Sequence, residues 1–410
     1  MKTLTPWLIG AGIIAIVAIG LFAWVLGGTR SSTQEETSTE IGLGSAPTQV
    51  IGSNSGSSDT QTNGITAFSQ NSPGAKVFKI ADGPVAGATL ILTLNPTTTL
   101  ARFVLQENGH VQDQPLDVAG SLPRAVSNTT VPGIARVWWG GKGTVAYLQY
   151  LDNTIKTLSL LFPATTTRVT AQAVEVQFFP DGITSLAPSP DGTHVAFLTS
   201  SGGGSEAYIS KSNASEPKKI FALPLSELLV SWPAASTLLL QTKSAAFVSG
   251  MIFSASPSTG NVVPILSAAG LTAAADKNFA YIVYQMNQGG GDRRSYVHDV
   301  GRNADAPLSF DPIPEKCVWS ARYATIMYCA VPGQYTDASY LDEWHKGAAS
   351  VSDAIVRFDV SNNTSTVVAV PGGSSGGEKS DVLQIAVSPD DKYLLFVKKG
   401  DRSLWGVRLF

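Results

Sequence analysis

The sequence predicts an all-β protein, a seven-bladed β-propeller, on two observations. The first is composition, because 43% hydrophobic residues, 39 glycines and 23 prolines in 410 residues suit a large core joined by many turns. The second is a repeated pattern: residues 185–200 read SLAPSPDGTHVAFLTS, and residues 384–399 read QIAVSPDDKYLLFVKK. A pattern that returns so far along the chain indicates a repeat architecture.

Each copy of the pattern is expected to form two strands joined by a tight turn. In the first copy, Pro190 presets φ and Gly192 takes a positive φ, and the apolar run 195–198 follows as a buried strand. We therefore predict that Gly192 is a structural turn residue.

Five more degenerate copies complete the set of seven, at residues 86–105, 135–150, 230–241, 270–285 and 316–330. Their second strands recur about every 42 to 50 residues, except before the last copy, which is the spacing of a four-stranded propeller blade. The last copy lacks an outer strand, and Lys76–Ile80 is expected to supply it and close the ring. Because residues 140–143 and 233–235 depart from the pattern, six or eight blades remain alternatives.

The Ser-Pro-Asp-Gly turn between two apolar strands, followed by a polar third strand and a basic or amphipathic fourth, resembles the WD40-like repeat of TolB-type bacterial envelope proteins. The resemblance covers two good copies and five degenerate ones across residues 75–410. It implies that Asp191 and Asp390 are structural residues that organise backbone amides at the turns. It also implies a periplasmic or surface location and a protein-binding role.

The N-terminal region is predicted to anchor the protein in a membrane. Residues 7–28 carry no charge, and as a helix they would measure roughly 33 Å, about the thickness of the hydrocarbon layer. Residues 1–6 are expected in the cytoplasm, because Lys2 precedes the span and glutamates follow it. A cleaved signal peptide is the alternative. Residues 29–72 are rich in Ser, Thr and Gly and predict a flexible linker to the propeller domain at 73–410.

The two cysteines, Cys317 and Cys329, flank the segment CVWSARYATIMYC, which is typical of two strands and a turn. Pairing Ser320 with Thr325 across that turn places the cysteines almost opposite each other, close enough for a disulfide. A disulfide would indicate an oxidising compartment, and so a propeller in the periplasm or at the cell surface. Two buried thiols are the alternative.

Charge and histidine distribution argue against several function classes. A net charge of −3 without a basic cluster argues against nucleic-acid binding. The four histidines occur singly in different repeats, so we predict no metal, no cofactor and no catalytic residue. A protein-binding or scaffold role in the cell envelope is therefore preferred. The alternative is a glycan lyase or hydrolase that uses carboxylates in the central channel.

An insertion at residues 333–350 in the sixth repeat is the strongest candidate for a binding site, because the fold does not require it. Aromatic residues beside carboxylates suit contact with a protein or possibly a glycan. The predicted partner-binding residues are Tyr335, Tyr340, Asp342, Glu343, Trp344 and His345. In the alternative, which does not exclude the first, Tyr340 and Trp344 pack back onto the blade as a local plug.

Overall fold

The computed structural model describes residues 76–94, 97–162, 174–288, 292–333, 339–372 and 380–410. The predicted membrane segment 7–28 and linker 29–72 lie outside these ranges. Within them, no helix has both the length and the apolar character needed to cross a membrane. All of the described residues belong to one compact unit, Thr62–Phe410.

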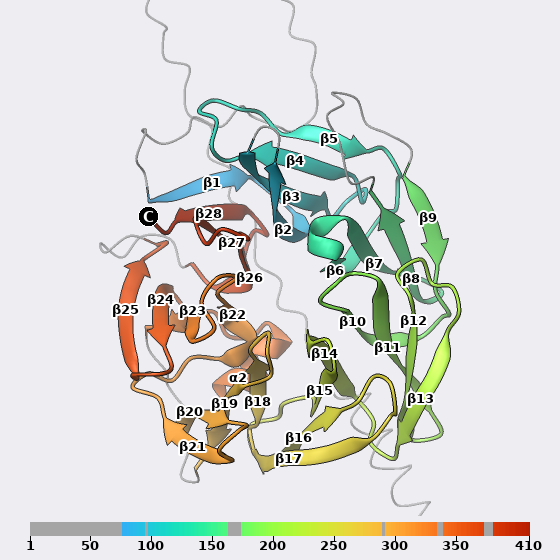
Figure 1. Ribbon diagram of the computed structural model, residues 1–410. Helices are drawn as coiled ribbons and strands as arrows, with labels where there is room; N and C mark the ends of the chain where they lie inside the picture. Colours follow the sequence, from blue (N-terminus) through green and yellow to red (C-terminus); the bar gives the residue numbers. More distant parts are fainter. Residues whose placement is uncertain (1–75, 95–96, 163–173, 289–291, 334–338, 373–379) are drawn as a thin grey trace, which may run out of the picture. The chain divides into compact units, whose positions relative to one another are not determined.

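The described residues form seven four-stranded antiparallel sheets arranged in a ring around a central axis (Figure 1). The first three blades are β2 (Val85–Leu94), β3 (Thr97–Leu105), β4 (Val111–Pro115) and β5 (Arg124–Ser127); β6 (Ile134–Gly140), β7 (Val145–Asp152), β8 (Thr154–Leu161) and β9 (Glu175–Phe178); and β10 (Ile183–Pro188), β11 (His194–Ser201), β12 (Gly204–Lys211) and β13 (Lys218–Leu223).

The next three blades are β14 (Leu228–Ala234), β15 (Thr237–Thr242), β16 (Ser249–Ala255) and β17 (Val262–Ala269); β18 (Thr272–Ala275), β19 (Tyr281–Asn287), β20 (Arg293–Asp299) and β21 (Ala304–Pro307); and β22 (Cys317–Trp319), β23 (Ile326–Pro332), β24 (Asp353–Asp359) and β25 (Thr364–Ala369). The seventh blade combines β26 (Val382–Val387), β27 (Tyr393–Lys398) and β28 (Leu404–Arg408) with β1 (Val77–Ala81). The predicted seven-bladed propeller is therefore confirmed, and six and eight blades are excluded.

The seven predicted hairpins coincide with the first two strands of the seven blades. The second strand of each blade contains at least three consecutive buried residues, and in β27 every residue is buried. A strand that is covered on both faces reads as a continuous apolar run, as YLLFVK does here. This burial is why the second strands gave the clearest signal in the sequence.

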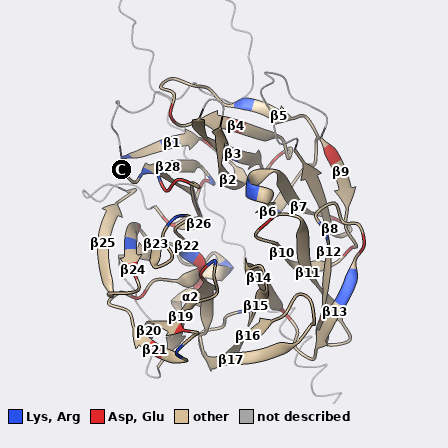
Figure 2. Cartoon of the chain, in the orientation of Figure 1, with Lys and Arg blue, Asp and Glu red and all other residues tan. Residues whose placement is uncertain are grey.

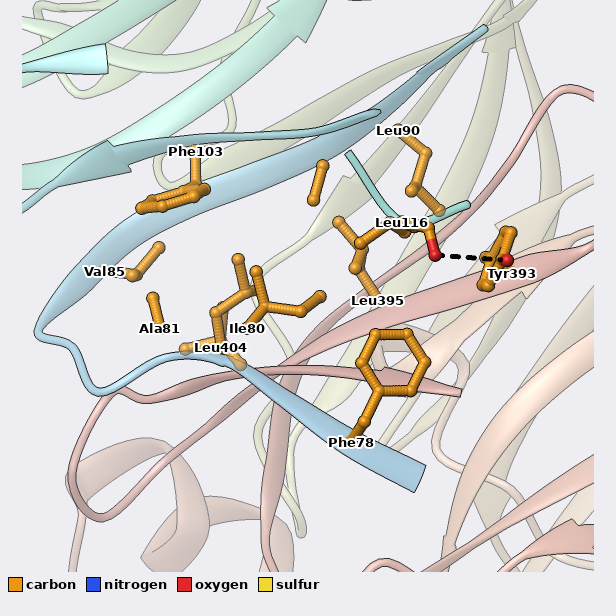
Figure 3. Close-up of a cluster of buried hydrophobic side chains, with 12 residues drawn as sticks. Phe78, Ile80, Ala81, Val85, Leu90, Phe103, Leu116, Tyr393, Leu395 and Leu404 are labelled. Atoms are coloured by element: carbon orange, nitrogen blue, oxygen red, sulfur yellow. Dashed lines mark hydrogen bonds between the residues drawn. The ribbon is translucent and has the colours of Figure 1, made fainter. Parts of the chain in front are cut away.

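The ring closes in the seventh blade, where β1 pairs antiparallel with β28 and Val77 lies opposite Val407. This confirms the predicted closure by the segment around Lys76–Ile80. Phe78 from β1 shares a buried apolar cluster with side chains of the first and seventh blades (Figure 3). Tyr393 donates a hydrogen bond to the Leu116 carbonyl of the first blade across this seam, at 3.4 Å. The two ends of the chain are therefore joined by a common core as well as by backbone pairing.

The turn at residues 189–193 is held by Asp191. Its Oδ1 accepts hydrogen bonds from the Ser189 hydroxyl at 2.5 Å and the Thr193 amide at 3.0 Å. These hydrogen bonds, led by that of Ser189, lower the pKa of Asp191 to about 2. Gly192 has φ +75°, and it packs so closely on Gly141 of the second blade that an added Cβ would lie 2.1 Å from the Gly141 Cα.

The corresponding turn of the seventh blade differs at one position. Asp390 accepts hydrogen bonds from the Ser388 hydroxyl at 2.7 Å and the Lys392 amide at 3.3 Å. The residue after it is Asp391, with φ +57°, where the third blade has glycine. Asp391 is buried and accepts hydrogen bonds from the hydroxyl of Ser320 and, at 2.9 Å, from the Ala321 amide. This turn therefore links the seventh blade to the sixth.

Cys317 on β22 and Cys329 on β23 form the predicted disulfide, with their Cα atoms 4.1 Å apart. The predicted register was wrong by one residue, because the Ser320 amide donates to the carbonyl of Ile326. The turn is wider than expected because the Ser320 hydroxyl accepts hydrogen bonds from the amides at 322 and 323. In the observed register the two cysteines lie directly opposite each other.

The antiparallel order gives the propeller two distinct faces. The connections between blades and the turns between second and third strands, such as residues 153, 243–248 and 339–352, lie on one face, which we call the insertion face. The turns between first and second strands, such as 189–193 and 320–325, lie on the opposite face, which we call the hairpin face.

Candidate partner-binding site

The insertion of the sixth blade contains a short helix, α2 (Tyr340–Lys346), on the insertion face. Asp342 and Glu343 lie in its first turn and His345 and Lys346 in its last, so the charges complement the helix dipole. Gly347 ends the helix with φ +79°, a conformation that glycine adopts at low cost. The local sequence therefore accounts for the helix.

The aromatic side chains of α2 point into the protein. Tyr340 and Trp344 are four residues apart and share one face of the helix, and they are only 4% and 5% exposed. They pack with Leu341 and Ile313 in a small apolar cluster. This is the predicted alternative of a local plug, and in this structure neither ring is available to a partner. Tyr335 lies outside the described residues.

The polar side chains of α2 tie the helix to neighbouring blades. Asp342 Oδ1 accepts a hydrogen bond of 2.9 Å from the amide of Ala246, in the turn between β15 and β16 of the fourth blade. His345 Nε2 lies 2.8 Å from Glu315 Oε2, in the connection between the fifth and sixth blades. Glu343 is exposed. Two of the three predicted polar residues are thus engaged with the propeller itself.

A buried group of charges lies beneath α2. Lys316 is fully buried, and its Nζ donates to Asp353 Oδ2 at 2.9 Å and to Asp381 Oδ1 at 2.7 Å. The indole nitrogen of Trp344 donates to the same Asp381 oxygen at 2.9 Å. Acidic and basic residues therefore meet beside α2, on the inner side of the ring (Figure 2).

Burial shifts the titration of two members of this group. It raises the pKa of Asp353 against the opposing effect of Lys316, and it lowers the pKa of Lys399. Lys399 Nζ donates to the carbonyls of Trp344 at 2.6 Å and Ala349 at 2.8 Å. The group holds α2 against the sixth and seventh blades.

The insertion face is open over the second, third and fourth blades. A groove of about 740 Å³ lies there, among the first residues of β6, β10 and β14 and the turns that follow β7, β11 and β15. Its walls are mainly apolar, with a few charged residues. The lining residues include Arg136, Leu151, Ile155, Glu227, Leu229 and Lys243.

A smaller chamber of about 360 Å³ lies in the central channel below the groove. It is lined by Arg136, Val137, Trp138, Ser185, Leu229, Val230, Gln241 and Gln384. Arg136 and Leu229 line both spaces, so the groove and the chamber adjoin. Among the described residues, no group of three or more His, Cys, Asp or Glu side chains is placed to hold a metal ion.

The groove residues were not predicted from the sequence. They lie at the ends of ordinary strands, where the sequence shows no insertion and no motif. The one available signal was Arg136, a charge near the start of an otherwise apolar first strand, IARVWWG. The prediction instead followed the insertion, whose aromatic residues turned out to face inward.

Comparison with known proteins supports the fold and does not assign a family. No known protein family and no curated protein matches the chain. Among solved structures, the chain is similar to an oligogalacturonate lyase in complex with manganese, with 14% identity over 84% of this chain and 95% of that chain and a TM-score of 0.58. At this identity the likeness shows the propeller fold alone.

Two further solved structures share the architecture at lower similarity. TolB from Acinetobacter baumannii matches with 12% identity over 68% of this chain and 62% of that chain, at a TM-score of 0.42. The β-propeller domain of the Trilobed protease from Pyrococcus furiosus matches with 13% identity over 64% of this chain and 78% of that chain, also at 0.42.

Proposed function

We propose that this chain is a membrane-anchored, extracytoplasmic β-propeller that binds a protein partner on the open part of its insertion face. The observation that carries the proposal is the groove over the second to fourth blades, beside a helix that covers other parts of the same face. Because α2 contacts the fourth to seventh blades there, the groove marks the region that is left uncovered.

Exposed apolar side chains lie in the groove and in the turn that contains its lining residue Lys243. Leu151, which lines it, is 75% exposed, and Ile155 across the same turn is also exposed. Phe247, four residues beyond the lining residue Lys243, is 71% exposed, and Val248 follows it. Apolar groups gathered beside polar ones on a soluble surface are typical of protein-binding sites.

Asp342 gives α2 a role in this surface. Its hydrogen bond to the Ala246 amide holds the turn that presents Phe247 and Val248. Asn287 supports the same turn by donating its side-chain amide to the Ala246 carbonyl. We therefore regard α2 as a support for the binding surface, where the sequence had suggested that it was the surface itself.

The proposed location rests on the disulfide and on the uncharged segment 7–28. A cross-strand disulfide persists in oxidising compartments. The location is tested by adding a membrane-impermeant protease to intact cells, or to cells with a permeabilised outer layer. Digestion of the propeller only after the inner membrane is broken would place it in the cytoplasm and reject the proposal.

Site-specific photo-crosslinking in the full-length chain tests the binding face. A photoreactive residue at Leu151 should give a discrete protein adduct, whereas one at Leu94 should not. Leu94 is a matched control, because it is 76% exposed and lies at the hairpin-face end of β2. Adding Ile155→Glu should abolish the adduct at Leu151. Adducts from Leu94 alone, or equal labelling at both positions, would contradict the proposal.

The alternative of a glycan lyase or hydrolase requires carboxylates in the central channel. Within the described residues, the side chains that line the chamber include a guanidinium and no carboxylate. We therefore do not advance this alternative. A turnover screen that includes oligogalacturonate tests it directly, and release of product would favour the enzyme.

A further inference from the structure

The internal repeats show that Arg136 is not required by the fold. In four blades the first strand contains an irregularity near its start, and the residue after it resumes pairing with the second strand. The residue before the irregularity is fully buried and apolar in all four blades. The residue after it is Gly87, Arg136, Ser185 or Gln384, so the same position accepts residues with no charge.

Arg136 lies where it can meet a ligand. It is exposed, and it lines both the groove and the chamber. Among the eight residues around the chamber, it is the only one that ionises. Across the described parts of the chain, its guanidinium takes part in no hydrogen bond or ion pair.

Arg102 provides a comparison, because it is an arginine whose hydrogen bonds stabilise the fold. It is buried, and its Nε and Nη2 donate to the two carboxylate oxygens of Asp113 at 2.7 and 2.8 Å. Its Nη1 donates to the carbonyl of Gly143 in the next blade at 2.9 Å. Every nitrogen of that guanidinium has an acceptor, whereas Arg136 presents the same fork of donors to an aqueous chamber.

Neutral polar groups beside Arg136 are held in place by the backbone. Gln241 accepts a hydrogen bond of 2.9 Å from the Ala273 amide through its Oε1, which leaves its side-chain N–H groups as further donors on the chamber wall. Gln384 donates to the Ala86 carbonyl at 3.2 Å. The chamber therefore combines one cation with fixed polar groups and lacks a competing anion among its described lining residues.

We infer that the chamber is a carboxylate subsite, in which Arg136 pairs with an acidic side chain of the partner that binds the groove. A free guanidinium matches a carboxylate through two parallel hydrogen bonds, and this pairing is among the strongest that proteins use. A chamber of about 360 Å³ is large enough for one side chain. This inference rests on the proposed function, because it assigns a residue type to the same partner.

The source of the carboxylate follows from the position of Arg136. Because the arginine lies where the groove and the chamber meet, a peptide in the groove can reach it with a side chain without ending there. The apolar groove residues Leu151, Ile155 and Leu229 suit apolar neighbours in that peptide better than a hydroxyl-rich sugar. The inferred ligand is therefore an internal Asp or Glu flanked by apolar residues.

Three capped tripeptides test the inference on the full-length protein in detergent, with saturation-transfer NMR as the readout. The probes are acetyl-Leu-Glu-Leu-amide, acetyl-Leu-Gln-Leu-amide and acetyl-Leu-Leu-Leu with a free carboxyl terminus. We expect the Glu peptide to bind about tenfold more tightly than the Gln peptide, because only the former can pair with Arg136. Equal binding of these two peptides, or binding of neither, would overturn the inference.

Variants test whether Arg136 is the residue that causes the preference for the Glu peptide over the Gln peptide. Arg136→Gln should make the Glu and Gln peptides bind equally, and it should fold normally because glutamine occupies the equivalent position 384. Arg136→Lys should keep part of the preference, and it serves as a second variant if the first is unstable. Lys218→Gln, which removes an exposed charge from the outer strand β13 and leaves the groove lining unchanged, should keep the full preference. A preference that survives in Arg136→Gln, or tighter binding of the free-acid peptide than of the Glu peptide, would reject the inference.

Crosslinking from Leu151 separates this inference from the proposed function. If the Arg136→Gln chain crosslinks to the partner as efficiently as the wild type, the carboxylate subsite is rejected and the binding face stands. If neither chain forms an adduct, the binding face itself is rejected. A loss of adduct in Arg136→Gln alone supports both.

Discussion

Replacing Lys316 by methionine should destabilise the propeller by about 3–5 kcal/mol, the usual cost of removing one partner from a buried ion pair. The lysine is 0% exposed and serves Asp353 at 2.9 Å and Asp381 at 2.7 Å. Methionine has a similar length, so the cost arises from two uncompensated carboxylates and not from a cavity. Lys399, at 3.9 Å from Asp381, is the nearest remaining cation and compensates only in part.

The assay is urea unfolding at pH 7, followed by circular dichroism and by tryptophan fluorescence. Coincident transitions of the two signals would justify a free energy of unfolding. Lys392→Met is the matched control, because this exposed lysine pairs with Asp390 at 3.5 Å on the hairpin face. An exposed pair contributes less than about 1 kcal/mol, so the control should unfold near the wild-type midpoint.

The pH dependence gives a second, independent measure. Burial already raises the pKa of Asp353 in the folded protein, and removing Lys316 should raise it further. A carboxyl group with a raised folded-state pKa favours folding below its unfolded pKa, and this contribution is lost as pH rises through the folded value. The variant should therefore recover stability relative to wild type as pH falls from 7 towards 4. A cost below about 1 kcal/mol at pH 7, or one that does not change with pH, would refute the reasoning.

Three further predictions concern the turns and the disulfide. Gly192→Ala should lower the free energy of unfolding by more than about 1 kcal/mol, and by more than the control Gly182→Ala does. Both glycines have φ +75°, but only at position 192 would the added Cβ meet backbone, at 2.1 Å from the Gly141 Cα. Equal urea midpoints for the two variants would contradict this packing argument. Reducing the disulfide should lower the free energy of unfolding by about 2–3 kcal/mol, because the bridge closes a loop of 12 residues. Alkylation of the unreduced protein followed by mass spectrometry should detect no free thiol. An alkyl adduct on either cysteine would disprove the bridge. Hydrogen bonds led by that of the Ser189 hydroxyl lower the pKa of Asp191 to about 2, so the wild type should be more stable than Asp191→Asn above about pH 4, and this difference should fade towards pH 2. Because the carboxylate is exposed, the difference in the free energy of unfolding should stay below about 1 kcal/mol in urea titrations. A difference that persists at pH 2 would count against the assignment.

The sequence predicted the fold well because the second strand of each blade is buried on both sides. That environment demands a short apolar run followed by a turn, and seven copies of it were recognisable even where the turn residues had changed. Closure by the segment around Lys76–Ile80 could be deduced because the last repeat lacked a strand. The one-residue error at Ser320 arose because the width of that turn depends on side-chain hydrogen bonds, which a strand pattern does not encode.

The site could be predicted only in outline. An insertion with Tyr340 and Trp344 draws attention in a sequence, but the direction of the Trp344 ring depends on Lys316 and Asp381, which lie far apart along the chain. Their pairing is a property of the assembled ring. Arg136 could be noticed in the sequence as a charge in an otherwise apolar strand, but its significance emerges from a comparison of the irregularities in four first strands.

The pairing of β1 with β28 closes the ring, and it is the first part of the propeller to bear a pulling force on the segment before Val77. The chain enters the propeller at Val77, so a pulling force on the preceding segment falls first on the hydrogen bonds between these two strands. β1 spans Val77–Ala81 and joins the ring along one edge only, whereas every second strand is paired on both edges. Under tension the ring should therefore open between β1 and β28. The other six blades should remain folded while β1 separates from the seventh blade.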